Sequence, residues 1–125
     1  MKTVFLAVAA TLLLLPGPAG AHHGLAAFDT SGEVTFKGTV TDFRFVNPHC
    51  VVEFEVKDDK DQVRVWKGEL TSAGHLAPRG WTAATLEAGD EVTITGYRAK
   101  NGAPSIWINK IVLPDGKALT IDTAN

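Results

Sequence analysis

The chain contains almost no sulfur. Its 125 residues include one cysteine, Cys50, and one methionine, the initiator Met1. A single cysteine excludes an intramolecular disulfide and a zinc site built from several cysteine thiolates. The lack of further methionines excludes a thioether-rich Cu(I) site. A metal site that pairs Cys50 with His49 is disfavoured, because neighbouring residues on a strand point to opposite faces.

Long apolar runs are missing after residue 21. Within residues 1–21, Lys2 gives a positive start, Val4–Leu15 is an apolar run, and Ala19-Gly20-Ala21 has the small-x-small pattern of a cleavage site. The run is too short for a membrane-spanning helix and suits a signal peptide. We therefore expect cleavage after Ala21, with Ala19 as the alternative. Residues 22–125 would then form one periplasmic or secreted bacterial domain without a membrane anchor.

Basic side chains are scarce as well. Lys and Arg number 12 against 14 Asp and Glu, which gives a formal net charge of −2. Removing Lys2 with the signal peptide leaves 11 basic against 14 acidic side chains, a net charge of −3. Proteins that bind nucleic acid by neutralising phosphates present a basic face. We therefore expect no nucleic-acid partner, and a partner in the periplasm would be a protein or a small molecule.

Motifs of common enzyme classes are also absent. The chain has no nucleophile elbow, phosphate-binding glycine loop, metalloprotease helix motif or recognisable pair of catalytic carboxylates. No residue is therefore assigned a catalytic role, and we expect a binding module and not an enzyme.

What the sequence does contain is period-2 alternation of apolar and polar residues, which predicts strands with one buried face. The first strand is predicted over 33–45, with a bulge near Thr41-Asp42, where the parity of the apolar residues changes. In the second strand, Cys50 falls on the apolar face and is expected to be buried. A short helical turn is predicted between Thr71-Ser72, which offers an N-cap, and Pro78, which ends the turn. The other strands are predicted over 50–56, 62–70, 91–98, 105–113 and 117–121.

This order of elements, three strands, a short helix and two strands, is that of a five-stranded Greek-key barrel of the OB type. Closure into a barrel removes the free edges that a small open sheet would expose. We therefore predict an all-β, OB-like barrel of five to six strands, with one short helix between strands three and four. An open antiparallel sandwich is the alternative.

Histidine is the residue type most suggestive of function. Cleavage after Ala21 would make His22 the first residue, so that its amine and ring could chelate a metal with His49 as a third ligand. Alternatively, the amine, the amide nitrogen of His23 and the ring of His23 could bind it. Cleavage after Ala19 would place His22 third, where an amine, two amides and an imidazole form a square plane. These donor sets suit Cu(II) and, as the second choice, Zn(II).

Other interpretations of the histidines remain open. His22 and His23 could be a solvated tail that only marks the processing site. His49 follows Asn47-Pro48, and its ring could cap that turn. His75 stands alone in the predicted helical turn and is expected at the surface. A terminal copper brace would also suit an oxidase, but the sequence predicts no flat substrate-binding surface.

An alternative binding site involves aromatic residues. Trp66, Trp81, Trp107 and Tyr97 could line a groove that stacks a base or a sugar, as some OB barrels do. A ligand- or protein-binding barrel of this kind would use Trp66, Glu69 and Trp81. The competing interpretation is that the tryptophans pack in the core and at its edges, because a small barrel needs large apolar side chains.

Several short motifs occur in order along the chain. They are Ala21-His22-His23-Gly24, Asn47-Pro48-His49, Trp66 with Glu69, Arg79-Gly80-Trp81, Leu86 with Ala88-Gly89-Asp90, and Asp115-Gly116. With these motifs the chain resembles a known family of small exported bacterial proteins, which is classed as a domain of unknown function. The resemblance extends over nearly all of residues 22–125. Mature chains of the family begin His-His-Ser-Phe, so this chain departs from the family pattern at Gly24 and Leu25. It also departs at Cys50, where the family usually has alanine, and around Thr71. The resemblance implies no established activity.

Overall fold

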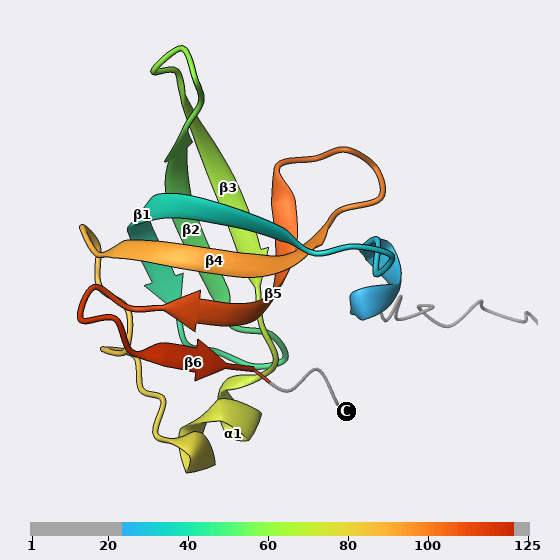
Figure 1. Cartoon of the computed structure of the whole chain (residues 1–125). Helices are drawn as coiled ribbons and strands as arrows, with labels where there is room; N and C mark the ends of the chain where they lie inside the picture. The colour runs from blue at the N-terminus through green and yellow to red at the C-terminus, as the bar shows by residue number, and fades with distance from the viewer. Residues whose placement is uncertain (1–23, 122–125) are drawn as a thin grey trace, which may run out of the picture.

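Five strands close into a barrel in the computed structural model, which describes residues 24–121 (Figure 1). The strands pair in the order β3-β2-β1-β4-β5-β6, and β3 also pairs in parallel with β5, which closes the barrel. The predicted OB-like barrel is confirmed, and the sixth strand extends the sheet beyond it. The strands are β1 (Val34–Arg44), β2 (Val51–Lys57), β3 (Val63–Glu69), β4 (Glu91–Arg98), β5 (Ser105–Val112) and β6 (Ala118–Thr120).

The long strand β1 bends where the sequence predicts it to. Its register against β2 shifts between Val40 and Asp42, so the strand carries a β-bulge there. The first half of β1 pairs with β4 and the second half pairs with β2. After the bulge Phe43 packs against the core, although its parity differs from that of Val34 and Phe36. The shift of the apolar residues from even to odd positions therefore marks the bend in β1. This bend lets one strand pair with β4 in its first half and with β2 in its second half.

A second bulge lies between β4 and β5. The register shifts between Thr95 and Gly96, and Asn109 is the extra residue on β5. At this point the two backbones approach so closely that a Cβ atom on Gly96 would collide with the carbonyl oxygen of Trp107. Gly96 is therefore required by the close approach of the backbone.

The short helix forms where it is predicted, at one end of the barrel (Figure 1). It comprises α1 (Ala73–Leu76), followed by the 3-10 turn η2 (Ala77–Arg79). The hydroxyl oxygen of Ser72 accepts a hydrogen bond from the backbone N–H of His75 at 3.2 Å, which caps the first turn. Leu76 is buried, so the turn covers the apolar end of the barrel.

The core fills the inside of the barrel and follows the predicted alternation. Cys50 is fully buried, and its Sγ donates to the carbonyl oxygen of Val46 at 3.5 Å. Burial raises the pKa of the Cys50 thiol. The buried apolar side chains that the strands contribute to this core cluster are Val40, Val52, Phe54, Trp66, Val92, Ile94, Ile106, Ile108 and Ile111.

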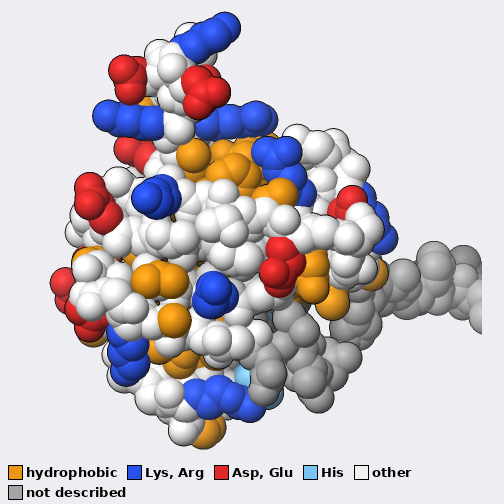
Figure 2. All heavy atoms as spheres, in the orientation of Figure 1, with side chains coloured by type: hydrophobic (Ala, Val, Ile, Leu, Met, Phe, Trp, Pro, Cys, Tyr) orange, Lys and Arg blue, Asp and Glu red, His pale blue; other side chains and the backbone are white. Residues whose placement is uncertain are grey.

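Charged side chains lie on the outside of the barrel, with acidic and basic residues interspersed (Figure 2). They gather at the projecting β2–β3 hairpin, where the last residue of β2, Lys57, is followed in the loop by Asp-Asp-Lys-Asp over residues 58–61. No helix in residues 24–121 has the length and apolar content needed to cross a bilayer. The predicted signal peptide, His22 and His23 lie outside the described residues.

Candidate functional site

The most distinctive feature of the barrel exterior is a buried tryptophan, Trp107 on β5. Its strand neighbours Ile106 and Ile108 are fully buried in the core, so the side chain of Trp107 faces the opposite, outer side of the sheet. An indole on an outer face would normally be exposed, yet Trp107 is only 6% exposed. Something must therefore cover it from outside the barrel.

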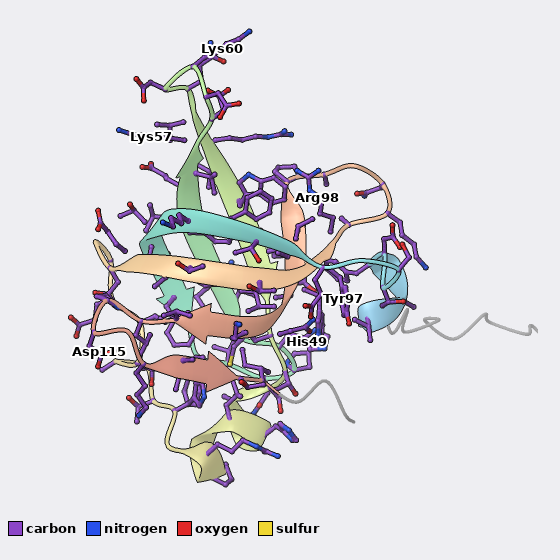
Figure 3. All side chains as sticks on the ribbon, viewed as in Figure 1. His49, Lys57, Lys60, Tyr97, Arg98 and Asp115 are labelled. Carbon is purple, nitrogen blue, oxygen red and sulfur yellow. The ribbon has the colours of Figure 1, made fainter. Side chains whose placement is uncertain are left out.

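Two rings from distant parts of the chain lie against this indole. The ring of Phe28 has its centroid 5.8 Å from that of Trp107, and the ring of His49 lies edge-on at 5.4 Å with an interplanar angle of 85°. Two strand partners flank the tryptophan, because Tyr97 on β4 and Glu69 on β3 are both paired with it. We call these five residues, Phe28, His49, Glu69, Tyr97 and Trp107, the Trp107 site. Figure 3 shows His49 and Tyr97 on the side of the barrel that faces the amino-terminal turn.

Phe28 is held there by the segment that begins at Gly24. Residues Leu25–Ala27 form the 3-10 turn η1, and Phe28 then bridges to Ala99 at the end of β4. The backbone N–H of Lys100 donates to the carbonyl oxygen of Ala27 at 3.0 Å, and its Nζ donates to that of Ala26 at 2.9 Å. The chain directly after His22 and His23 is therefore fixed to the β4–β5 loop.

His49 is held in place by the loop between β1 and β2, in which the Asn47-Pro48 peptide bond is cis. The side-chain oxygen of Asn47 accepts a hydrogen bond from the backbone N–H of Gly74 at 3.0 Å, so the loop is clamped to α1. The backbone N–H of Cys50 donates to the carbonyl oxygen of Thr71 at 3.1 Å. Because Cys50 points inward, the preceding His49 points outward. In this arrangement Asn47 contacts the helix and the ring of His49 contacts Trp107.

Glu69 brings a carboxylate to the Trp107 site. Its Oε1 lies 3.0 Å from Nζ of Lys67 on the same face of β3, and the side chain is 21% exposed. Glu69 and Trp107 are paired across the seam where β3 meets β5 in parallel, so their side chains leave the same face of the sheet. The closure of the barrel therefore sets this carboxylate beside the tryptophan.

The three residues of the alternative binding groove occupy separate places. Trp66 points into the barrel and packs against Phe36, with centroids 4.5 Å apart, and Trp81 packs against Phe43 at 6.3 Å. Both tryptophans belong to the buried core cluster. Glu69 is three residues from Trp66 on one strand, so the two side chains lie on opposite faces. The structure therefore associates Glu69 with Trp107 and places Trp66 and Trp81 in the packed core.

Of the three predicted metal ligands, the structure describes only His49. His22 and His23 lie outside the described residues. Within residues 24–121, no group of three or more His, Cys, Asp and Glu side chains is gathered closely enough to hold a metal ion. His75, the other described histidine, lies half-buried on α1. A metal site that includes His49 would thus need donors from the segment before Gly24.

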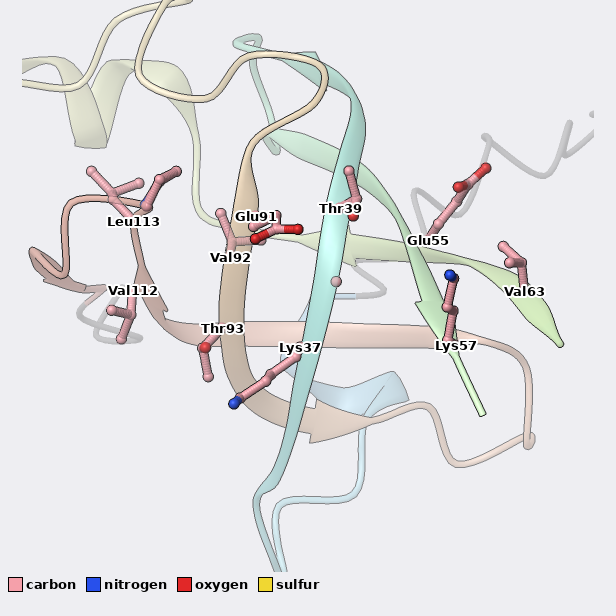
Figure 4. A pocket seen from close by; sticks show the side chains of 12 residues that line it. Lys37, Thr39, Glu55, Lys57, Val63, Glu91, Val92, Thr93, Val112 and Leu113 are labelled. Carbon is pink, nitrogen blue, oxygen red and sulfur yellow. The ribbon is translucent and has the colours of Figure 1, made fainter. Parts of the chain in front are cut away.

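Another surface groove lies elsewhere, across the outer face of β1 (Figure 4). Its volume is about 630 Å³, and its lining includes Lys37 and Lys57 as well as Glu55 and Glu91. Two cations and two carboxylates give the groove no net charge, and no aromatic ring lines it. It therefore shows no preference for a ligand of either sign.

Sequence reasoning does not identify Phe28 as a site residue, and it names Tyr97 and Trp107 only as candidate groove-lining aromatics beside Trp66 and Trp81. Alternation within residues 105–108 already places Trp107 opposite Ile106 and Ile108, and that signal could have marked it as outward-facing. The residues that cover it could not be found in this way, because they come from two loops that meet it only in the folded barrel.

Comparison with known proteins supports the resemblance seen in the sequence. No curated protein gives a significant match to the chain. A family model described as a family of unknown function (DUF6152) matches residues 10–106, a range that includes His22, His23 and His49. Because the match covers most of the chain, this protein belongs to that family of unknown function.

Proposed function

We propose that this protein is an exported, non-enzymatic module that binds Cu(II) through His22, His23 and His49. One observation carries the proposal. Phe28, which anchors the segment that follows the two terminal histidines, packs on the same indole as the ring of His49. Phe28, five residues after His23, is thus held near the imidazole of His49.

The distances are compatible with one shared site. His23 immediately precedes Gly24, the first described residue, and lies five residues before Phe28. Five residues of chain span at most about 18 Å. Because Phe28 and His49 each lie against Trp107, with centroids 5.8 Å and 5.4 Å away, the rings of His22 and His23 are within reach of His49.

The donor set favours Cu(II) over other divalent ions. Cleavage after Ala21 would free an amine at His22, and an amine with two or three imidazoles suits a tetragonal Cu(II) site. Zn(II) also accepts imidazole ligands, but it stands below Cu(II) in the affinity order of nitrogen sites. Cu(II) is therefore the metal to test first and Zn(II) the second.

The test is native mass spectrometry of the exported protein, with and without one equivalent of Cu(II) and in the presence of a competing chelator. We expect the intact mass of a chain that begins at His22, and one copper ion retained per chain. A parallel series with Zn(II) should show weaker retention. A protein that retains no copper contradicts the proposal.

Variants separate the shared site from nonspecific binding. Acetylation of the terminal amine should abolish copper retention. His49→Ala should weaken Cu(II) binding by about tenfold or more, because even residues that only hydrogen-bond to a metal ligand contribute about tenfold to metal affinity. His75→Ala is the matched control, because His75 lies on α1, and it should bind as the unaltered protein does. Equal binding by the double variant His22→Ala/His23→Ala would overturn the proposal.

A further inference from the structure

A second feature of the barrel lies at its mouth, between β3 and the β4–β5 loop, and involves two arginines. The guanidinium carbon of Arg98 lies 5.1 Å from the centroid of the Trp66 ring and 5.5 Å from that of Phe36. The guanidinium carbon of Arg64 lies 5.9 Å from the Trp66 centroid. Both cations are thus held over one buried indole by cation–π contact. Figure 3 labels Arg98 at this end of the barrel.

Neither guanidinium has an anionic partner in the described part of the chain. The ion pairs there are made by Arg44 and Lys67, and Arg79 donates a side-chain hydrogen bond to the carbonyl oxygen of His75. Arg64 and Arg98 make neither kind of contact within residues 24–121. An arginine side chain is always charged and carries five N–H donors. The two guanidiniums therefore present donors that have no acceptor within residues 24–121.

These arginines line a cavity of about 410 Å³ with a positive lining. Lys100 is a third cation of the lining, and Asp29 is the single acidic residue. Asp29 already accepts hydrogen bonds from the backbone N–H and the hydroxyl of Ser31, at 3.0 Å and 2.7 Å. These bonds lower the pKa of the Asp29 carboxyl, so it stays ionised and engaged with Ser31. In a chain with a net charge of −2, this local excess of positive charge is unusual.

We propose that this cavity binds a small ligand through a carboxylate or phosphate group, with the guanidiniums of Arg64 and Arg98 donating to its oxygens. The planar guanidinium of arginine can donate two parallel hydrogen bonds to a carboxylate or a phosphate. Because both guanidiniums already lie over the indole of Trp66, the two side chains lose less conformational freedom when the anion binds. The volume falls in the range of small-molecule sites, so the anionic group can belong to a larger organic molecule. The cavity uses none of the proposed copper ligands, and its test is independent of theirs.

The test is an NMR titration of the metal-free, full-length mature protein at constant ionic strength. Inorganic phosphate is the probe in one arm and succinate in the other, with chloride as the reference salt. We expect saturable shifts of the side-chain N–H signals of Arg64 and Arg98 and of the backbone of residues 99–103. The arm that saturates at lower concentration identifies the preferred anionic group. Shifts that never saturate, or that chloride reproduces, would overturn the proposal.

Three substitutions locate the site. Arg64→Gln should weaken binding of the preferred anion by about tenfold, the loss expected for one charged hydrogen-bonding partner. Arg98→Lys keeps the charge but loses the planar guanidinium and should weaken binding similarly without exposing Trp66 fully. The matched control is Arg44→Gln, because Arg44 already pairs with Asp42 and Glu53 at 3.6 Å and 3.5 Å. Binding that is unchanged in both Arg64→Gln and Arg98→Lys contradicts the assignment.

Discussion

Cys50 is the residue whose chemistry follows most directly from its position in the core. Its side chain is fully buried, and burial raises the pKa of the thiol above the ordinary value of 9.0. Below that value the thiol keeps its proton in the folded and the unfolded chain. As the pH rises further, the unfolded chain ionises first, so the free energy of unfolding falls. Cys50 therefore makes the fold sensitive to alkaline pH.

This leads to a prediction about Cys50→Ala. At neutral pH the variant should be less stable by roughly 1 kcal/mol, because a buried atom is removed. The difference in free energy of unfolding between the two proteins should shrink as the pH rises above about 9, since only the unaltered chain carries the thiol. Urea unfolding of both proteins at a series of pH values measures this difference. A difference that stays constant or grows at alkaline pH would contradict the raised pKa.

The tryptophans show how far the role of a single residue can be predicted. From the sequence alone, Trp66 and Trp81 suit either a groove or the core, and both lie in the core. Trp107 is as buried as they are, but on the opposite side of the barrel wall. Alternation of apolar and polar residues indicates on which face of its own strand the side chain of a residue lies. It does not indicate the loops that pass over that residue, because their position depends on long-range packing.

Among the elements, the bulge between β4 and β5 places the strictest demand on one position, Gly96. A Cβ atom there would meet the carbonyl oxygen of Trp107, which backbone hydrogen bonding keeps from moving away. We expect Gly96→Ala to cost about 3 kcal/mol or more, at the upper end of overpacking effects. Gly32→Ala is the control, because no atom lies within 4 Å of the position that its Cβ atom would take, and it should be nearly neutral. Thermal unfolding of both variants tests the contrast, and similar stabilities would refute it.

The loop between β1 and β2 depends on Asn47. Its side-chain oxygen accepts the backbone N–H of Gly74, so it joins the loop to α1. Asn47→Ala should lower the free energy of unfolding by about 1 kcal/mol, as the loss of a capping acceptor does. Asn47→Asp retains an acceptor oxygen and should recover most of this loss. Chemical denaturation provides the measurement, and an Asp variant as unstable as the Ala variant would show that the hydrogen bond is not the cause.

At the scale of strands and turns, local pattern is a good guide. Strand β4 occupies Glu91–Arg98 as predicted, and the parity change near Thr41-Asp42 does mark a bulge. These features depend on neighbours within a few positions, so they are visible in the sequence. The pairing of Glu69 with Trp107 is different, since it depends on which strands meet when the barrel closes. Sequence reasoning therefore groups Glu69 with Trp66, whereas closure groups it with Trp107.

At the scale of the whole molecule, the segment that precedes β1 is attached to the outside of the barrel. Phe28 joins the two, because it bridges to Ala99 and covers Trp107 beside His49. Phe28→Ala should cost about 3 kcal/mol as a buried aromatic truncation, and it should shift tryptophan emission to longer wavelength as Trp107 becomes exposed. If His22 and His23 share a copper ion with His49, the variant should also lose about tenfold in Cu(II) affinity, because their position is no longer fixed.

A second phenylalanine separates this effect from general loss of stability. Phe43 packs against Phe45 and Trp81 at 6.1 Å and 6.3 Å, away from the Trp107 site. Phe43→Ala should therefore lower the free energy of unfolding as well, while its Cu(II) affinity stays that of the unaltered protein. Copper titration against a competing chelator, at a temperature where both variants are folded, decides between the outcomes. An equal loss of affinity in both variants would mean that copper binding follows overall stability. No loss in Phe28→Ala would mean that His22 and His23 bind copper without the barrel.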